Sequence, residues 1–111
     1  MGDRANIHIR EGEHDKGVYL YTHWIGTELP EILKDALLKR WRWNDTPYLT
    51  RIIFDEMSKD CHDEETGFGI STFVGDGDDR IIEIIVEDQL VEIKGKTWTF
   101  EEYIKDNPHW L

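Results

Sequence analysis

Long apolar runs are absent from this 111-residue sequence, and it has one cysteine, Cys61. No stretch approaches the ~18 consecutive apolar residues that a membrane-spanning helix needs, so we expect no membrane partner. A single cysteine cannot form a disulfide within the chain, which is typical of a protein in a reducing compartment. We therefore predict a cytoplasmic location.

Basic residues are also scarce, with 13 Lys and Arg against 24 Asp and Glu and a formal net charge of −11. Residues 1–55 carry nine acids and eight bases, whereas residues 56–111 carry fifteen acids and five bases. Because nucleic-acid affinity comes from basic side chains that neutralise phosphates, we expect no direct DNA or RNA binding. The acidic half could instead act as a DNA mimic that covers a partner's basic groove, or serve only solubility.

The sequence does contain enough apolar material for one core. Hydrophobic residues make up 39% of the chain and aromatic residues 12%, a composition typical of a folded protein. A chain of this length can form a core without disulfides or metals, and no repeat, linker or low-complexity segment divides it. We therefore predict a single domain over residues 1–111.

Two antiparallel strands are predicted at the start of the chain. Residues 4–10 alternate polar and apolar side chains, and residues 18–24 form the returning strand after a glycine-containing turn. The simplest register pairs residues 5, 7 and 9 with residues 22, 20 and 18. That register places Arg4 and Asn6 beside His23 and Tyr21 on the second face of the hairpin.

Two helices are predicted next, each with one apolar stripe for the core. Thr27 is the expected cap of a helix that runs to about residue 41 and has Pro30 in its first turn. Asp45 or Thr46 is the expected cap of the second helix, which has Pro47 in its first turn and runs to about residue 59.

Three strands and a last helix complete the prediction. Residues 68–74 and 81–87 form a hairpin around a turn at residues 75–79, and residues 90–94 form the next strand with a short extension at residues 97–98. Thr99 and Glu102 form a capping box for a helix over residues 100–106, with Trp98 and Tyr103 as its hydrophobic staple. The order β-β-α-α-β-β-β-α predicts an α+β domain with helices layered on a mainly antiparallel sheet of about five strands.

The end of the second strand is the first candidate site. There a strand meets the start of a helix, where unpaired backbone N–H groups favour an anion. An imidazole and an indole add a hydrogen-bonding group and a stacking face. The ligand-binding candidates here are Arg4, Asn6, Thr22, His23, Trp24 and Thr27. The alternative is an ordinary buried aromatic cluster in which His23 is hydrogen-bonded.

A basic segment at residues 39–43 alternates Lys and Arg with Trp. Arg and Trp together suit a phosphate and a stacked base, and Arg51 on the second predicted helix is a further ligand-binding candidate. The structural alternative is that these bases complement the dipole at the end of a helix. Exposed aromatic side chains at Trp41, Trp43 and Trp110 could form a homodimer contact.

No metal, cofactor or catalytic signature is specific. Residues 60–65 contain acids, Cys61 and His62 but lack the paired ligand spacing of a zinc site. Residues 76–87 begin like a calcium loop, yet their fifth and sixth positions are arginine and isoleucine rather than an oxygen ligand and glycine. We predict no metal and no cofactor. The sequence favours a protein without catalytic activity, because no nucleophile–base pair can be placed.

Two resemblances extend this interpretation. The element order resembles, in small form, the core of the N-terminal-nucleophile hydrolases, but removal of Met1 would expose Gly2, which has no side chain to attack a substrate. A group of small bacterial and phage proteins with no established activity is similar to this chain in six segments. These are GDRAN (2–6), YLYTHW (19–24), LP (29–30), RIIF (51–54), GFGIS (67–71) and WTFEE (98–102). The resemblance implies single-domain integrity and a phage or mobile-element origin, and no mechanism.

The leading functional hypothesis is therefore a non-enzymatic cytoplasmic binding protein, encoded by a phage or mobile element. It would sequester a small anionic or nucleotide-like ligand, for example a defence signal, at the strand-end site. The first alternative is an acidic inhibitor of a protein partner, and the second is a small hydrolase.

Overall fold

The computed structural model describes residues 2–61 and 65–110. Within these residues the chain forms six strands, three α-helices and one short 3-10 helix. In order they are β1 (Ala5–Arg10), β2 (Val18–Thr22), η1 (Gly26–Glu28), α1 (Leu29–Leu38), α2 (Thr46–Ser58), β3 (Phe68–Ser71), β4 (Ile81–Ile85), β5 (Leu90–Ile93), β6 (Lys96–Thr99) and α3 (Phe100–Lys105). The α+β class is confirmed, and the short extension after β5 is a full sixth strand.

The strands form one sheet in the order β3-β2-β1-β4-β5-β6. The predicted register of the first hairpin is confirmed, because residues 5, 7 and 9 pair with residues 22, 20 and 18. All neighbouring strands are antiparallel except β1 and β4, which are parallel. This parallel pair makes the sheet mixed.

The predicted hairpin between residues 68–74 and 81–87 is wrong. β3 pairs with β2 at one edge of the sheet, whereas β4 lies on the other side of β1. Alternate β4 side chains, Ile82 and Ile84, are fully buried, so this strand is stable in the middle of the sheet rather than at its edge. Residues 72–80 therefore cross the sheet, and the Asn6 side-chain amide donates to the carbonyl of Asp76 at 2.9 Å.

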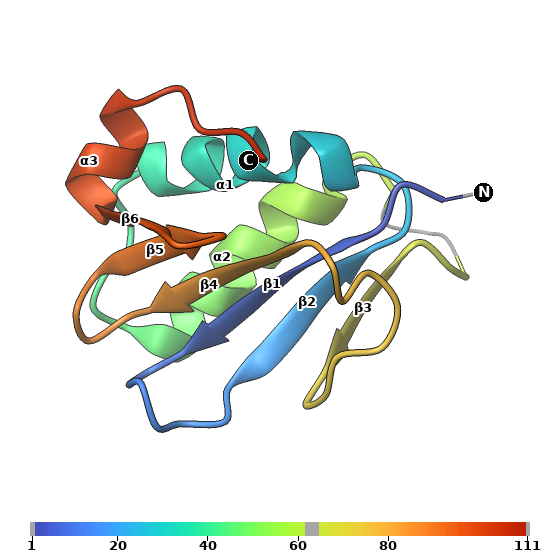
Figure 1. Ribbon diagram of the computed structural model, residues 1–111, viewed down its shortest axis with the longest axis horizontal. Coiled ribbons are helices and arrows are strands. Elements are labelled where there is room, and N and C mark those ends of the chain that lie inside the picture. Colours follow the sequence, from blue (N-terminus) through green and yellow to red (C-terminus); the bar gives the residue numbers. More distant parts are fainter. Residues whose placement is uncertain (1, 62–64, 111) are drawn as a thin grey trace.

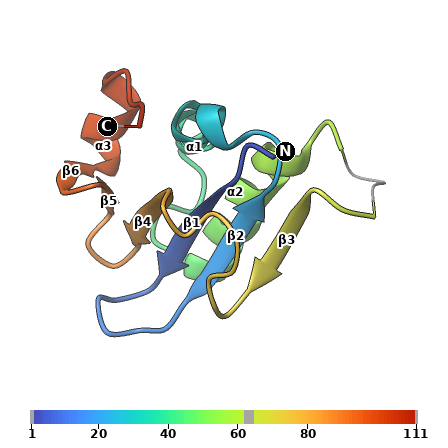
Figure 2. The same cartoon turned by 45° about the vertical axis from the view of Figure 1, so that its right-hand side comes forward.

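The core lies between the sheet and two of the helices. Figures 1 and 2 show α1 and α2 on one face, while the other face is free of helices. Side chains from β1, β2 and β4 meet side chains from both helices in one buried cluster. Its fully buried members include Ile7, Leu20, Ile82, Leu33 and Leu49. We call the helix-free side the open face.

The predicted first helix is too long at both ends. α1 ends at Leu38 rather than near residue 41, because Arg40 and Arg42 adopt left-handed backbone conformations with φ of 58° each. Thr27 lies in η1, and α1 has no side-chain cap at its N-cap residue. The second helix is capped by Asp45, one of the two predicted residues, whose carboxylate accepts from the Tyr48 N–H at 3.3 Å.

The last helix begins as its sequence predicts. Thr99 and Glu102 form both bonds of the capping box, and the Trp98 and Tyr103 rings pack edge to face with centroids 5.2 Å apart. The buried Tyr103 hydroxyl donates to the Pro30 carbonyl of α1 at 2.7 Å. Burial raises the pKa of this hydroxyl far above its ordinary value. The contact joins the end of the chain to α1.

Replacing Tyr103 by phenylalanine should lower the free energy of unfolding by about 1 kcal/mol, because one buried hydrogen bond between α3 and α1 is lost. Urea denaturation measures the change. Tyr48→Phe is the matched control. It also removes a hydroxyl, but the Tyr48 side chain is exposed, so the free energy of unfolding should not change. Equal effects of the two substitutions would contradict the assigned role of the Tyr103 hydroxyl.

Candidate ligand-binding site

Arg4 and His23 meet at one end of the open face. The Nδ1 atom of His23 contacts Arg4 Nε at 3.3 Å and the Tyr21 hydroxyl at 2.9 Å. Since an arginine Nε can only donate, Nδ1 carries no proton in this arrangement. A Cβ atom on Gly2 would lie 2.6 Å from His23 Nε2, 2.8 Å from Cε1 and 2.9 Å from Cδ2, so residue 2 packs against the face of the ring. His23 therefore positions Arg4 and Tyr21.

Thr22 and Trp24 have structural roles around this end of β2. The buried Thr22 hydroxyl accepts from the N–H groups of Trp24 at 3.3 Å and Ile25 at 3.2 Å, which closes the turn after the strand. Trp24 is 42% exposed, and its ring lies edge to face with Phe68. Gly67 also lies against this ring. Its φ of +105° favours glycine, and an added Cβ would lie only 2.6 Å from a carbon of the Trp24 ring, so a side chain has no room there.

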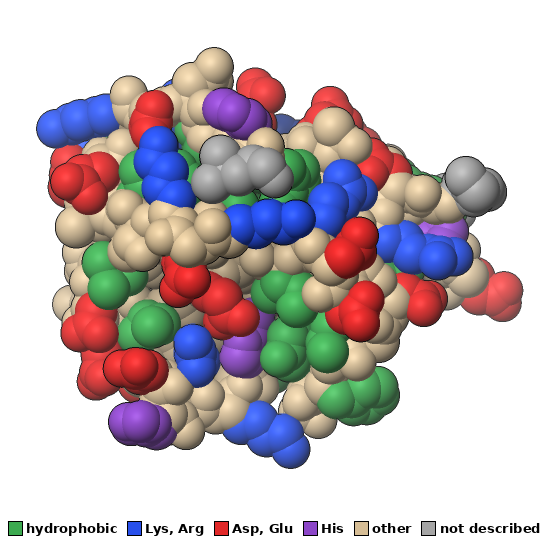
Figure 3. Space-filling view, viewed as in Figure 1, with side chains coloured by type: hydrophobic (Ala, Val, Ile, Leu, Met, Phe, Trp, Pro, Cys, Tyr) green, Lys and Arg blue, Asp and Glu red, His purple; other side chains and the backbone are tan. Residues whose placement is uncertain are grey.

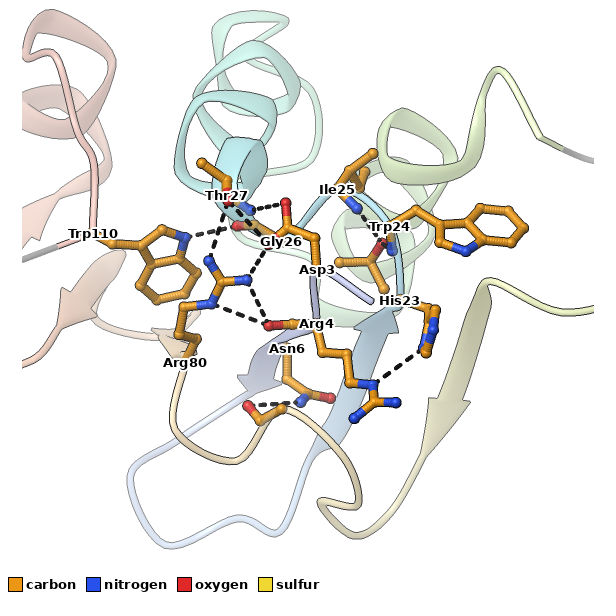
Figure 4. A network of polar contacts seen from close by, with 12 residues as sticks. Asp3, Arg4, Asn6, His23, Trp24, Ile25, Gly26, Thr27, Arg80 and Trp110 are labelled. Atoms are coloured by element: carbon orange, nitrogen blue, oxygen red, sulfur yellow. Dashed lines mark hydrogen bonds and ion pairs between the residues drawn. The ribbon is translucent and has the colours of Figure 1, made fainter. Parts of the chain in front are cut away.

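The start of the helix does not present free N–H groups to a ligand at Thr27. The Thr27 N–H and hydroxyl both donate to the carboxylate of Asp3 at 3.0 Å (Figure 4). The anion that the sequence predicts at this position is thus a side chain of the same protein. Hydrogen bonding by Arg80, and then by the Thr27 backbone, lowers the pKa of Asp3 below its usual range.

Asp3, Arg80 and Trp110 were not predicted to lie at this site, but they form one network with Arg4 and Thr27. The Arg80 guanidinium pairs with the Asp3 carboxylate, donates to the Arg4 carbonyl from Nη2 at 2.9 Å, and lies 5.5 Å from the centre of the Trp110 ring. No local pattern could reveal these contacts. They arise because the parallel pairing of β1 with β4 brings the residue before β4 beside the start of β1.

Arg51 does not join the strand-end residues. It lies on the exposed side of α2, where its guanidinium pairs with Asp55 at 2.7 Å. It borders a separate depression of about 330 Å³ together with Lys39 and Trp41. The basic segment and Arg51 are therefore neighbours, and Arg4 is not in the lining of this depression.

Two of the three tryptophans considered for a homodimer contact are engaged within the chain. The indole N–H of Trp43 donates to the Leu37 carbonyl at 3.1 Å, and that of Trp110 donates to the Gly26 carbonyl at 2.7 Å. Both rings are half-buried. Trp41 is 58% exposed and is the one that remains available to a partner.

The open face has a depression of about 210 Å³ beside Arg4, which we call the open-face depression. It is lined by Asn6, Tyr21, residues 69–71 of β3, Phe73, Gly75 and Asp76. Apolar surface is accessible here, since Phe73 is 70% exposed. Figure 3 shows hydrophobic side chains gathered on the β2–β3 side of this face.

Arg4 differs from the other arginines in its surroundings. Arg10, Arg40, Arg42, Arg51 and Arg80 each have a carboxylate within 4.0 Å, whereas Arg4 has none among the described residues. Its guanidinium shares His23 Nδ1 with the hydroxyl of Tyr21, so it lies next to a residue that lines the open-face depression. Burial raises the pKa of Tyr21, and the nearby positive charge of Arg4 opposes that shift.

The described part of the chain has no group of three or more histidine, cysteine or carboxylate side chains arranged to hold a metal ion. Residues 62–64 of the acidic segment considered above lie outside the described residues. Over residues 2–61 and 65–110, no helix combines the length and the apolar character needed to cross a membrane.

Comparisons with known proteins add no relative. No protein-family model matches the chain, and neither a curated protein nor a solved structure is significantly similar to it. The resemblances to small bacterial and phage proteins and to the N-terminal-nucleophile hydrolases stay predictions. Function must be argued from the site.

Proposed function

We propose that this protein is a non-enzymatic cytoplasmic binding protein for a small anionic, nucleotide-like ligand, which it holds at the open-face depression. The observation that carries the proposal is Arg4. In a chain with a net charge of −11, this arginine lacks a carboxylate partner among the described residues. It shares His23 Nδ1 with the hydroxyl of Tyr21, which lines the depression. A cation that is not neutralised by the protein can pair with an anionic group of a ligand.

The size of the depression supports a ligand that is only partly enclosed. Its volume of about 210 Å³ is below the ~300–1,000 Å³ of sites that enclose a whole drug-sized molecule. A single aromatic ring system fits this space between Tyr21 and Phe73. The ligand's charged group would then lie outside the depression, on Arg4.

Sequestration is a better proposal than turnover. Ser71 supplies an aliphatic hydroxyl to the lining. Its Oγ donates to the Phe73 carbonyl at 2.5 Å and accepts from the Phe73 N–H at 2.9 Å. His23 uses Nδ1 for Arg4 and Tyr21, and it is not among the residues that line the depression. A general base for this serine would have to come from elsewhere. For a phage or mobile element, removal of a nucleotide defence signal is one concrete role.

Arg4→Ala tests the proposal. We expect wild-type protein to show a rise in thermal midpoint with at least one member of a panel of adenosine monophosphate, cyclic nucleotides and ADP-ribose. Titration calorimetry should then give a Kd at least tenfold weaker for Arg4→Ala, because the pairing of guanidinium and phosphate is lost. Arg51→Ala is the matched control, since it removes an exposed arginine outside the depression.

Two outcomes would contradict the proposed function. The first is a flat response of the wild-type protein across the whole panel. The second is equal weakening by Arg4→Ala and Arg51→Ala, which would indicate only a general effect of net charge.

The acidic-inhibitor hypothesis has one supporting observation. In the segment 76–92, several exposed acids have no basic partner within 4.0 Å among the described residues, and Glu87 and Glu92 are examples. Glu83 is different because its carboxylate pairs with His8 and Arg10. Charge reversal at Glu87 and Glu92 therefore tests this alternative through weaker binding of a basic partner. Glu83 should be left intact, because its substitution would also break contacts within the protein.

A further inference from the structure

The side-chain amide of Asn6 has a fixed orientation below the rim of the open-face depression. Asn6 is 1% exposed, and its Nδ2 atom donates to the carbonyls of Asp76 at 2.9 Å and Gly77 at 3.4 Å. Reversing the amide would place its oxygen against these two carbonyl oxygens. Nδ2 therefore faces the 72–80 segment, and Oδ1 must point the other way.

The Oδ1 atom of Asn6 is an acceptor with no donor in the described chain. Figure 4 shows it on the side of Arg4, away from the Asp76 carbonyl. Asn6 also belongs to the lining of the depression. Oδ1 keeps contact with solvent, because the one buried side-chain atom without a partner among the described residues is Arg10 Nε. A ligand that fills the depression would displace this solvent and must supply a donor in its place.

A second acceptor group borders the same space. The Asp76 side chain lies in the lining, and its negative charge is close enough to Tyr21 to help raise the pKa of that hydroxyl. An anionic group of a ligand would be repelled on this side and attracted on the Arg4 side. The depression thus has acceptors in its lining and a cation beside Tyr21, and its lining also includes the accessible Phe73.

We infer that the ring held in the open-face depression presents N–H donors to Asn6 and Asp76, which makes the ligand an amino-substituted heterocycle with an anionic group, such as an adenine nucleotide. This inference rests on the proposed function and narrows it. A ring without N–H groups would fill the same volume but leave Asn6 Oδ1 desolvated and unpaired. Sites built to pair a polar group of a ligand discriminate strongly against the analogue that lacks it.

The test uses two ligands of nearly equal size. Adenosine 5′-monophosphate carries the exocyclic amino group, and purine riboside 5′-monophosphate has hydrogen in its place. Titration calorimetry with wild-type protein should give a Kd at least tenfold weaker for purine riboside 5′-monophosphate. Because the change is made in the ligand, no variant has to fold. Asp76→Asn, which keeps the backbone carbonyl used by Asn6, should reduce the preference for the amino compound.

The outcomes separate this inference from the proposed function. If both nucleotides bind with equal affinity and both are weakened by Arg4→Ala, the donor requirement is overturned and the anionic site stands. If no adenine compound of the panel binds while a cyclic nucleotide with another base binds in an Arg4-dependent manner, the adenine assignment is overturned and the anionic site stands. If no member of the panel binds, the inference and the proposed function are both overturned.

Discussion

Arg80→Ala should lower the free energy of unfolding by about 3 kcal/mol. The side chain donates to the Arg4 carbonyl from Nε at 3.1 Å and from Nη2 at 2.9 Å, pairs with Asp3, and contacts the Thr27 hydroxyl at 3.4 Å. Hydrogen bonds from charged groups contribute about 1.5–3 kcal/mol each, and the stacking on Trp110 adds about 0.5–1 kcal/mol. The expected loss is smaller than the sum of these contributions, because all the contacts belong to one guanidinium that is partly exposed to solvent.

The reason for this large effect is that Arg80 joins three separate segments. Asp3 precedes β1, Thr27 lies in η1 and Trp110 lies near the end of the chain. Without the guanidinium, the Asp3 carboxylate keeps its two bonds to Thr27 but loses its counter-charge. The N-terminal segment and the end of the chain should then open together, before the rest of the domain unfolds.

Urea denaturation at pH 7 measures the change, and hydrogen exchange of the residue 3 and residue 27 amides shows where it acts. Arg80→Lys should recover only part of the loss, since an ammonium cannot reach three acceptors as the planar guanidinium does. Arg51→Ala is the matched control, because its helical surface pair with Asp55 contributes only about 0.3–0.5 kcal/mol. Equal losses for Arg80→Ala and Arg51→Ala would disprove the proposed role of the network.

Glu83→Ala should lower the free energy of unfolding by about 2 kcal/mol at pH 6, because a hydrogen bond between charged groups is removed from a half-buried position. The Glu83 carboxylate contacts His8 Nδ1 at 2.8 Å and Arg10 Nη2 at 3.3 Å. His8 is buried and its ring is stacked on Tyr19 with centroids 4.1 Å apart. Removal of the carboxylate leaves two cationic side chains side by side.

The geometry of His8 also predicts a dependence on pH. Its Nε2 atom contacts the Lys16 carbonyl at 2.7 Å, so both ring nitrogens face acceptors. Both can donate only when the imidazole is protonated. The hydrogen bond to Glu83 raises the pKa of His8 above the ordinary value of 6.5, while burial and the nearby charge of Arg10 oppose that shift.

A raised pKa in the folded state stabilises the protein at low pH. The contribution of His8 is fully present below pH 6.5, where the unfolded chain is also protonated, and it is lost as the pH rises through the folded-state pKa of His8. The free energy of unfolding should therefore fall as the pH rises above 6.5. Urea denaturation at intervals from pH 5.5 to 9 gives the curve.

His8→Gln provides the control for this pH dependence. Glutamine can donate to one acceptor at every pH, so the fall in stability above pH 6.5 should become shallower in this variant. Glu87→Ala should leave the wild-type curve unchanged, because Glu87 is exposed and has no basic partner among the described residues. The assignment of a protonated His8 fails if wild type and His8→Gln give parallel curves.

Local patterns predicted the parts of this fold that depend on neighbouring residues. The register of β1 and β2 was predictable because side chains alternate between two faces and a shift by one residue would expose Ile7 and Leu20. The caps of α2 and α3 were predictable because each involves residues only three apart. The meeting of Arg4 with His23 followed from the same register.

Other features of the site depend on contacts between distant residues. Asp3 and Arg80 carry no motif, and the turn chemistry of residues 75–79 is equally compatible with a hairpin or a crossing segment. The accessible Phe73 and the fixed amide of Asn6 both result from that crossing. The proximity of Arg51 to Lys39 and Trp41 could not be derived from the sequence, because helical spacing shows which side of α2 Arg51 occupies but not what lies opposite.

The amino-acid sequence alone determined an acidic α+β domain, the pairing of its first two strands and the chemistry that begins its last two helices. The tertiary structure alone decided that β4 lies parallel to β1, that Asp3 occupies the anion position at Thr27, and that the open-face depression forms beside Arg4. The physical reason is range: alternation and capping act over a few residues, whereas burial of a central strand is decided by the whole sheet.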